Sequence, residues 1–155
     1  MRGATDTAHD EAIVDVADRL RRSMMRLTRI LRQEDTDDLS PTLASVLFTI
    51  DRHGPVTLGD LARLERLTKP SVTAIVDKLV VRRLIERHPD EHDRRIVRVE
   101  LTPAGRRRVN ARRSQRTAWL AARLRDLPAA EVAALRDAAT VLERLVAEAT
   151  EEPNR

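Results

Sequence analysis

Apolar residues recur with helical spacing near both ends of the chain. From Ile13 to Leu31, and again from Val132 to Val146, they follow one another at intervals of three or four residues. Since an α-helix has about 3.6 residues per turn, each set forms one apolar stripe along a helix. We therefore predict an amphipathic helix over about residues 10–33, after a frayed polar tail, and a second one that carries the C-terminal stripe.

Helix-capping residues mark three shorter helices in the middle of the chain. A Ser or Thr side chain just before a helix accepts a hydrogen bond from an otherwise free amide of its first turn. The capping residues are Ser40, Thr57 and Thr68. The predicted helices cover residues 41–53, 58–66 and 69–81. Only two residues separate the last two, and two short helices joined by such a tight turn are typical of a helix-turn-helix.

The spacing then changes to the alternation that is typical of β-strands. Residues 84–87 and 96–101 are rich in β-branched and other apolar side chains, and a charged segment joins them. These segments predict a β-hairpin with a charged tip. A long helix follows from about residue 104 to residue 126, because Pro128 interrupts the helical pattern.

Together these elements predict one mainly helical (α+β) domain over residues 1–155. A winged helix-turn-helix lobe occupies about residues 40–103, because a hairpin that follows a helix-turn-helix forms a wing. The flanking segments, about 10–33 and 104–149, contain the apolar stripes. Each stripe fits packing inside one chain about as well as packing against a partner, but two at opposite ends favour a homodimer. The residues assigned to dimerisation are Ile13, Ala17, Leu20, Leu135, Leu142 and Val146.

Charge is distributed unevenly along the chain. The 155 residues contain 29 Lys and Arg against 25 Asp and Glu. Between Leu61 and Arg116, however, 16 basic residues stand against 7 acidic ones. Such a basic segment suits a phosphate backbone, although a solvated face in an Arg-rich chain explains the charge equally well. Phe48 and Trp119 are the only aromatic residues, which disfavours recognition of single strands by base stacking.

Double-stranded DNA is the partner that the predicted elements fit. The polar start of the helix over 69–81 carries hydroxyl and ammonium groups that reach phosphates and base edges. A wing-tip arginine enters the minor groove, where negative potential is concentrated. The residues assigned to DNA binding are Thr68, Lys69, Pro70, Ser71, Thr73, Lys78, Arg94 and Arg95. Asp93 lies on the same side of an extended chain as Arg95, and we expect it to orient the arginine guanidinium.

The wing also contains a specific motif. From Asp93 to Gly105 it reads Asp-x-Arg, three residues, an aliphatic residue, one residue, Leu-Thr and x-x-Gly. Four upstream segments accompany it: Leu58-x-x-Leu61-Ala62, Lys69-Pro70-Ser71-Val72-Thr73, Val76-Asp77-x-Leu79 and Leu84-Ile85-Glu86-Arg87. In order and spacing this closely resembles the MarR family of winged-helix transcriptional regulators, over about residues 10–148. The resemblance implies a dimer that binds pseudo-palindromic operators, usually as a repressor, and often releases DNA when a small-molecule effector binds.

The chain departs from the family pattern at two positions. Many relatives have a basic residue where Ala74 stands in the recognition helix, so we expect one base or phosphate contact to be missing. Relatives usually have Gly where Arg83 stands, and a left-handed cap is costly for Arg, so either the turn differs or strain is tolerated. The few aromatic residues also disfavour the phenolic-anion pocket common in the family, and the absence of cysteine excludes its thiol-oxidation branch.

Metal binding and catalysis are poorly supported. His88 and His92 lie near acidic residues, but a four-residue spacing on a hairpin does not bring two ligands together. A hydrated wing is therefore the better interpretation. The sequence contains no nucleophile–base pair, and its four glycines offer little for a phosphate-binding loop. We expect no enzyme activity, no cofactor and no metal site.

No apolar run approaches the roughly 20 residues that a membrane span requires, and the polar N-terminus lacks a signal-peptide core. These features predict a cytoplasmic protein without membrane contact. Two alternatives to a DNA-binding regulator remain: a winged-helix dimer that binds only a protein partner, and a small-ligand carrier or enzyme. The basic segment and the wing arginine disfavour the first, and the second lacks a visible catalytic or cofactor set.

Overall fold

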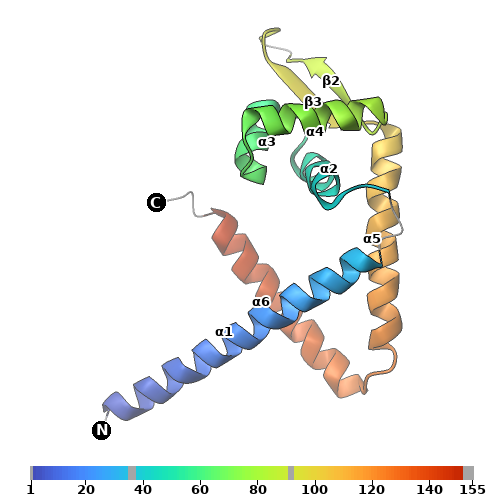
Figure 1. Ribbon diagram of the computed structural model, residues 1–155. Coiled ribbons are helices and arrows are strands. Elements are labelled where there is room, and N and C mark those ends of the chain that lie inside the picture. The colour runs from blue at the N-terminus through green and yellow to red at the C-terminus, as the bar shows by residue number, and fades with distance from the viewer. Residues whose placement is uncertain (1, 35–37, 91–92, 152–155) are drawn as a thin grey trace. The chain divides into compact units, whose positions relative to one another are not determined.

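The computed structural model describes residues 2–34, 38–90 and 93–151. The chain forms two compact units, Met1–Arg116 and Thr117–Arg155. The helices and strands, labelled in Figure 1, are α1 (Arg2–Gln33), α2 (Pro41–His53), β1 (Val56–Thr57), α3 (Leu58–Glu65), α4 (Lys69–Val81), β2 (Ile85–Pro89), β3 (Val97–Leu101), α5 (Pro103–Leu124) and α6 (Ala129–Glu151).

Three antiparallel strands form a small sheet in the order β1-β3-β2. The central strand β3 places Val99 opposite Val56 of β1. The predicted hairpin is confirmed, but β2 continues to Pro89 instead of ending at Arg87, because its last two residues still pair with β3. Strand β1 was not predicted, since a strand of two residues has no alternation in its sequence and is defined only by its pairing with β3.

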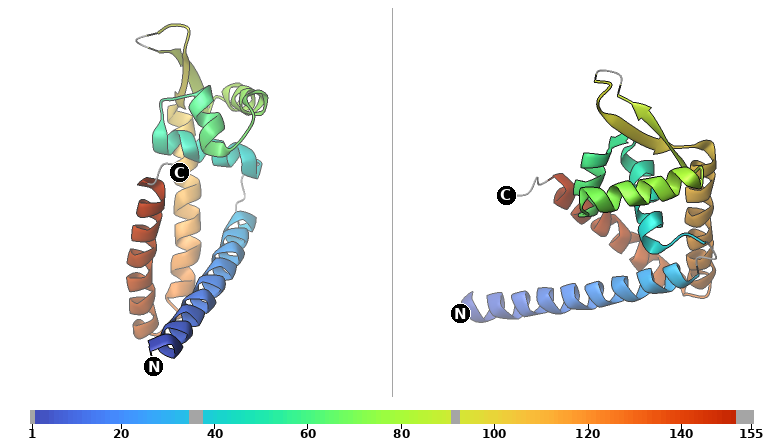
Figure 2. Two further views of the ribbon diagram at one scale, coloured as in Figure 1. Left: turned by 90° about the vertical axis from the view of Figure 1, so that its left-hand side faces the viewer. Right: turned by 45° about the horizontal axis from the view of Figure 1, so that its top comes forward.

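The hydrophobic core of the first unit lies between this sheet and helices α2, α3 and α4. Each element supplies a side chain that is at most 1% exposed: Leu47, Leu61, Val72, Leu79 and Val99. Val109 of α5 joins the same core. Burying one such side chain contributes about 1.5–3 kcal/mol. Both views of Figure 2 show the β2–β3 hairpin projecting beyond these helices, so the core fixes the base of the hairpin and leaves its tip in solvent.

The first helix is longer than predicted. α1 begins at Arg2, whereas the predicted start was near residue 10, after a frayed tail. That expectation was wrong. The segment contains no proline, so no residue in it lacks the backbone N–H that the helix requires. Polarity alone does not end a helix.

Two backbone features fix the junction of α4, β2 and α5. Arg83 adopts a left-handed conformation with φ of 58°, so the strain of this cap is tolerated, at a cost of about 1–2 kcal/mol. Its carbonyl accepts a hydrogen bond of 2.7 Å from the Thr102 hydroxyl. On α5, Gly105 lies so close to the Leu84 carbonyl that an added Cβ atom would be 2.0 Å from the oxygen. These contacts hold the start of α5 against the start of β2.

Candidate nucleic-acid interface

A turn of three residues joins α3 to α4, and its geometry confirms the predicted helix-turn-helix. Arg66 adopts a left-handed conformation with φ of 54° and ends α3. The Leu67 amide then donates a 2.9 Å hydrogen bond to the Ala62 carbonyl, which closes the last turn of the helix. Thr68 follows at once as the cap of α4, its hydroxyl accepting from the Ser71 amide. The direction of α4 is therefore set within a few residues.

The start of α3 is held by a charged cap. The Thr57 hydroxyl accepts a 3.0 Å hydrogen bond from the Asp60 amide and donates to the Asp60 carboxylate at 2.8 Å. Arg63, one turn later, donates to the same carboxylate at 2.8 Å. The hydrogen bonds from Arg63 and Thr57 lower the pKa of Asp60 below its ordinary value of 3.8. The ionised carboxylate thus favours the folded start of α3.

Helix α4 has one buried face and one exposed face. The spacing of the apolar residues predicts that Val72, Ile75, Val76 and Leu79 face the core. Val72, Val76 and Leu79 are fully buried, while Ile75 is only partly buried. The residues assigned to DNA binding on this helix are all exposed: Thr68, Lys69, Pro70, Ser71, Thr73 and Lys78. The lobe therefore presents the polar face of α4 to solvent and anchors the helix through the apolar face.

The hydroxyl groups at the start of α4 form hydrogen bonds within the helix. The Thr68 and Ser71 hydroxyl oxygens are 2.9 Å apart. The Thr73 hydroxyl donates to the Lys69 carbonyl at 3.0 Å, so its proton is used within the helix. An engaged hydroxyl still accepts hydrogen bonds through its lone pairs. Thr73 is consequently placed as an acceptor, and so is whichever of Thr68 and Ser71 donates in their pair, beside the positive end of the helix dipole.

The wing tip is a compact turn organised by aspartates. The Asp90 amide donates to the Ile96 carbonyl at 2.8 Å, and the Ile96 amide donates to the Asp93 carbonyl at 2.9 Å. The Asp93 carboxylate accepts the Arg95 backbone amide at 3.0 Å. We expected this carboxylate to orient the Arg95 guanidinium. It orients the backbone instead, because an aspartate in a turn readily reaches the amide two residues later.

Asp90 and Arg98 form the part of the wing that sequence reasoning missed. Asp90 is only 8% exposed, and its carboxylate is paired with the Arg98 guanidinium through Nε. Arg98 also donates through Nη1 to the Pro55 carbonyl at 3.3 Å. This pair links the wing to the segment before β1. The available signal was that Asp90 and Arg98 carry opposite charges near the tip of the predicted hairpin, which was interpreted only as hydrated.

His88 meets two carboxylates on the face of the hairpin. Its Nε2 atom is 3.0 Å from Glu100 and 3.6 Å from Glu86. Among the described residues, these three form the group whose potential metal-binding atoms lie within 4.8 Å of one another. The side chains are partly exposed, and a cross-strand contact between His88 and Glu100 accounts for the arrangement. Of the cluster considered in the sequence, His92 and Glu91 lie outside the described residues.

Comparisons with known proteins identify the family of this chain. The family model described as the MarR family matches residues 37–96. An HTH-type transcriptional regulator of Mycobacterium bovis is 36% identical over 127 residues, which cover 81% of this chain and 89% of that protein. The chain belongs to the MarR family. The family and the winged-helix fold predicted from the sequence are thereby confirmed, and the family consists of transcriptional regulators and not of enzymes.

Solved structures agree with the assignment to the MarR family. A Pseudomonas aeruginosa PA01 protein is 34% identical with a TM-score of 0.76, and the match covers 86% of this chain and 94% of that one. The S. aureus MepR F27L mutant, solved with a bound oligodeoxyribonucleotide, has a TM-score of 0.65 at 20% identity, with coverages of 84% and 97%. At that identity, the second likeness concerns the fold alone.

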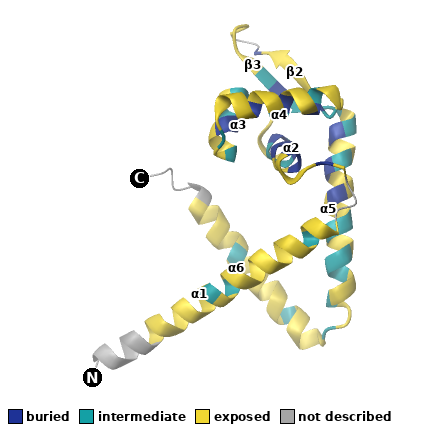
Figure 3. Cartoon of the chain, in the orientation of Figure 1, coloured by how far each residue is buried: buried dark blue, intermediate teal, exposed yellow. Residues whose placement is uncertain are grey.

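Most described residues of the terminal helices α1 and α6 of this MarR-family chain are exposed (Figure 3), and they include large apolar side chains. The residues assigned to dimerisation are exposed at Ile13, Ala17, Leu135 and Val146, and half-buried at Leu20 and Leu142. Val14 and Val16 of α1 and Leu145 of α6 are more than half exposed as well. The predicted apolar stripes, with their intervals of three and four residues, did not include these three residues. None of the described helices combines the length and the apolar character that crossing a lipid bilayer requires.

The family departure on α4 has a direct structural consequence. Ala74 is exposed on the face opposite the buried residues. Where many relatives have a basic side chain, this helix therefore presents a methyl group. Nearby, Asp77 forms a 2.6 Å ion pair with Arg87 of β2, so the positive charge of Arg87 is already paired within the protein. The positive charge available on α4 itself comes from Lys69 and Lys78 at the two ends of the helix.

Proposed function

We propose that this regulator binds double-stranded DNA in a sequence-specific manner, as a homodimer on a pseudo-palindromic operator. One observation carries the proposal: a single compact unit presents both the polar face of α4 and a wing whose Arg94 and Arg95 are exposed. The two elements suit two neighbouring grooves of a duplex. The DNA-bound MepR mutant, which has the same fold, supports this use of the lobe.

In this proposal α4 enters the major groove with its start toward the bases. The contacting residues on the helix are Thr68, Lys69, Pro70, Ser71, Thr73 and Lys78. Lys69 neutralises a phosphate, and the oriented hydroxyl of Thr73 accepts a hydrogen bond from an exposed amino group of adenine or cytosine. The Pro70 ring offers an apolar contact to a thymine methyl group. With Ala74 in place of a basic residue, specificity depends more on hydroxyls than on charge.

The wing supplies the second contact, in the minor groove. Arg95 inserts where the groove is narrow and its potential is most negative, and Arg94 contacts the adjacent phosphates. The Asp93 carboxylate holds the backbone of the turn at Arg95 by accepting a hydrogen bond from its amide. The Asp90–Arg98 pair fixes the wing at its stem, so the arginine reaches the groove from a rigid support.

The homodimer follows from the apolar residues that α1 and α6 leave exposed. Apolar stripes on the two terminal helices suit packing against their counterparts in a second chain. A two-fold dimer places two α4 helices at a fixed separation, which matches the two half-sites of a palindrome. Sedimentation velocity measures the state directly. We expect a dimer at micromolar concentration, and conversion of exposed Leu145 and Val146 to Glu should shift the species toward monomer.

Repression is the proposed effect on transcription, because a dimer seated on an operator excludes polymerase from the overlapping promoter. We also propose that a small-molecule effector releases the DNA. Both features belong to the usual behaviour of the family that this chain resembles. A transcription assay with the operator placed over a promoter tests the sign of the effect, since an activator would raise the transcript level.

Binding to duplex DNA upstream of the protein's own gene tests the central proposal. The titration is made at two salt concentrations with unrelated duplex as competitor. We expect tight binding that resists competitor and weakens steeply as salt rises, because counterions are released from the neutralised phosphates. If binding is weak and equal on both duplexes, selection from random duplexes is the second arm. Failure to enrich any sequence there contradicts specific DNA recognition and favours a protein partner for the lobe.

A further inference from the structure

Lysine is rare in this chain, and both of its lysines lie on α4. Of the 29 basic residues, two are lysines, Lys69 and Lys78, and the other 27 are arginines. α4 contains no arginine, whereas every basic residue outside α4 is an arginine. Only one of several hundred ways to place two lysines among these 29 positions puts both on this helix. The placement indicates that α4 requires a primary amine, and not a positive charge alone.

A primary amine can lose its charge by a chemical change that a guanidinium resists. Lysine is a target of acylation, whereas arginine stays charged in proteins. We propose that Lys69 and Lys78 are acylated by an activated acyl donor, and that acylation weakens the binding of α4 to DNA. The chain has no cysteine and no tyrosine that would compete for the donor. Only the effect on DNA rests on the proposed function. The modification itself does not.

Both amines are accessible in the folded lobe. The side chains of Lys69 and Lys78 are exposed, and neither amine forms a hydrogen bond or an ion pair with any residue that the structure describes. Asp77, the acidic neighbour of Lys78 in the sequence, is instead paired with Arg87 at 2.6 Å. An acyl donor therefore meets these amines without first breaking a contact inside the protein.

The two amines lie on opposite flanks of α4. Nine positions separate Lys69 from Lys78, which is about two and a half turns and roughly 13 Å along the helix axis. Their side chains leave the helix on either side of the exposed face that carries Pro70 and Ala74. In the proposed complex this face meets the base edges of a major groove about 12 Å wide. Each lysine then lies toward one of the two phosphate strands that border the groove, so acylation of either one removes a phosphate contact.

The chemical step needs only the amine and the donor. The neutral amine attacks the carbonyl carbon of an acyl phosphate or an acyl thioester. An N–C bond forms, the bond from that carbon to the phosphate oxygen or thioester sulfur breaks, and the leaving group departs with the electron pair. The nitrogen loses one proton to solvent, and no atom is oxidised or reduced. Because the product is a neutral amide, each event removes one positive charge from α4.

Peptide mass spectrometry after incubation with acetyl phosphate tests the site of modification. The chain used carries Arg19→Lys, which places a matched control amine at an exposed position of α1. In the free protein we expect acetylation at Lys69, at Lys78 and at position 19. Acetyl-coenzyme A in a parallel reaction distinguishes a thioester donor from an acyl phosphate. Absence of acetylation from α4 with both donors overturns the proposal, most directly where position 19 reacts.

Operator affinity of the same chain before and after treatment tests the effect on DNA. When the free protein is acetylated, we expect the affinity to fall at least about tenfold and its salt dependence to flatten, because fewer phosphates are neutralised. When the operator complex is acetylated, the bound DNA should shield α4, so that only position 19 reacts. The affinity measured after removal of that DNA should then stay within about twofold of its starting value.

Three outcomes of this experiment contradict a specific part of the proposal. Acetylation of α4 that leaves the operator affinity unchanged overturns the effect on DNA. Equal acetylation of α4 in the free protein and in the operator complex places both lysines outside the interface and overturns that effect as well. A chain that is acetylated on α4 but binds no duplex, before or after treatment, overturns the proposed function and not the modification site.

Discussion

The Asp93 carboxylate accepts the backbone amide of Arg95 at 3.0 Å and leaves the Arg95 side chain exposed at the tip of the wing. The aspartate therefore shapes the turn and does not hold the guanidinium. We therefore expect the aspartate of the wing motif to be required for its acceptor oxygen, which a neutral amide side chain also offers. We expect its negative charge, close to the proposed DNA site, to weaken DNA binding.

Two substitutions of equal charge separate these roles of Asp93. Asp93→Asn keeps an oxygen acceptor for the Arg95 amide, so we expect operator affinity equal to or above that of wild type. Asp93→Ala removes the acceptor, and we expect it to bind about three- to tenfold more weakly than Asp93→Asn, because the loss of one such hydrogen bond costs about 1 kcal/mol. Fluorescence anisotropy with labelled operator measures both. Equal affinities for the two variants would contradict the turn-forming role.

Removal of the wing arginine tests the minor-groove contact. We expect Arg95→Ala to weaken operator binding by more than tenfold, because a guanidinium in a narrow groove contributes both charge and shape recognition. Arg19→Ala on α1 is the control for a generic loss of positive charge and should change the affinity little. Unchanged affinity of the Arg95→Ala variant would exclude the wing from the interface.

Salt dependence distinguishes a phosphate contact from a base contact at Lys69. We expect Lys69→Ala to weaken binding to all sequences similarly and to flatten the plot of log affinity against log salt. The slope should fall by about 0.9 for each phosphate that the protein no longer neutralises, which is about 2 for a dimer. The measurement is a series of operator titrations between low and moderate salt. A slope identical to that of wild type shows that Lys69 does not neutralise a phosphate.

The close approach of Gly105 to the Leu84 carbonyl predicts a large loss of stability on substitution. In Gly105→Ala the added Cβ atom meets backbone on one side and Leu101 Cδ2 at 3.3 Å on the other, so the start of α5 must shift. We expect a loss of about 2 kcal/mol or more from overpacking. Urea denaturation at fixed protein concentration checks it. The control is Gly59→Ala, where the nearest atom is the Thr57 hydroxyl at 3.7 Å and stability should be unchanged or slightly higher.

The lowered pKa of Asp60 predicts a pH-dependent contribution to stability. Its carboxylate is more acidic in the folded chain, so its stabilisation is present above the unfolded value of 3.8 and is lost as pH falls through the folded pKa. We expect Asp60→Asn to be less stable than wild type at about pH 6, with the difference shrinking below about pH 4. Denaturation midpoints across this range measure it, with Asp126→Asn as the reference for losing one exposed carboxylate. A difference that grows on acidification would reverse the assigned sign.

The elements whose signal is local were predictable from the sequence. Capping by Thr57 and Thr68 requires only neighbouring residues, and α3 and α4 begin where these caps placed them. The spacing of Val72, Val76 and Leu79 fixed the buried face of α4, because three- and four-residue intervals bring side chains to one side of any helix. The wing motif with its Asp93 was recognisable for the same reason, as a short run of fixed spacing.

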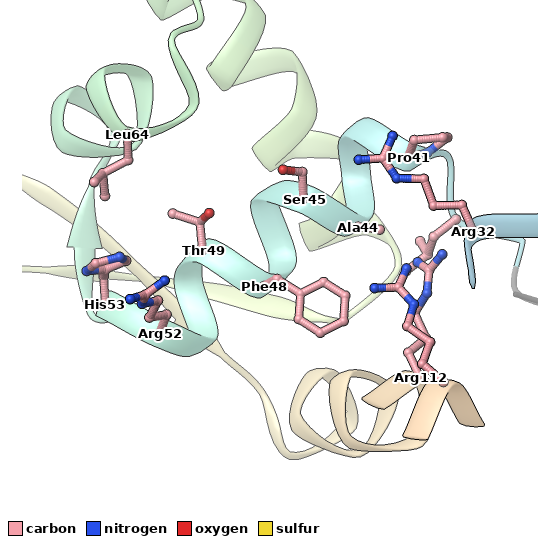
Figure 4. A pocket seen from close by; sticks show the side chains of 12 residues that line it. Arg32, Pro41, Ala44, Ser45, Phe48, Thr49, Arg52, His53, Leu64 and Arg112 are labelled. Carbon is pink, nitrogen blue, oxygen red and sulfur yellow. The ribbon is translucent and has the colours of Figure 1, made fainter. Parts of the chain in front are cut away.

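Only the tertiary structure decided the relationships between distant residues. The strand β1 exists because β3 pairs with it, and the Arg98 bond to the Pro55 carbonyl depends on that pairing. A pocket beside α2 is lined by arginines from α1, α2 and α5 (Figure 4), and no periodicity in the sequence connects these residues. The hydrogen bonds from Ser45 and Thr49 to the Glu65 carboxylate join α2 to α3. Local propensity acts over a few residues, whereas these contacts arise from packing over tens of residues. The amino-acid sequence alone therefore determined most of the helices and the family, and the tertiary structure decided which distant residues are in contact.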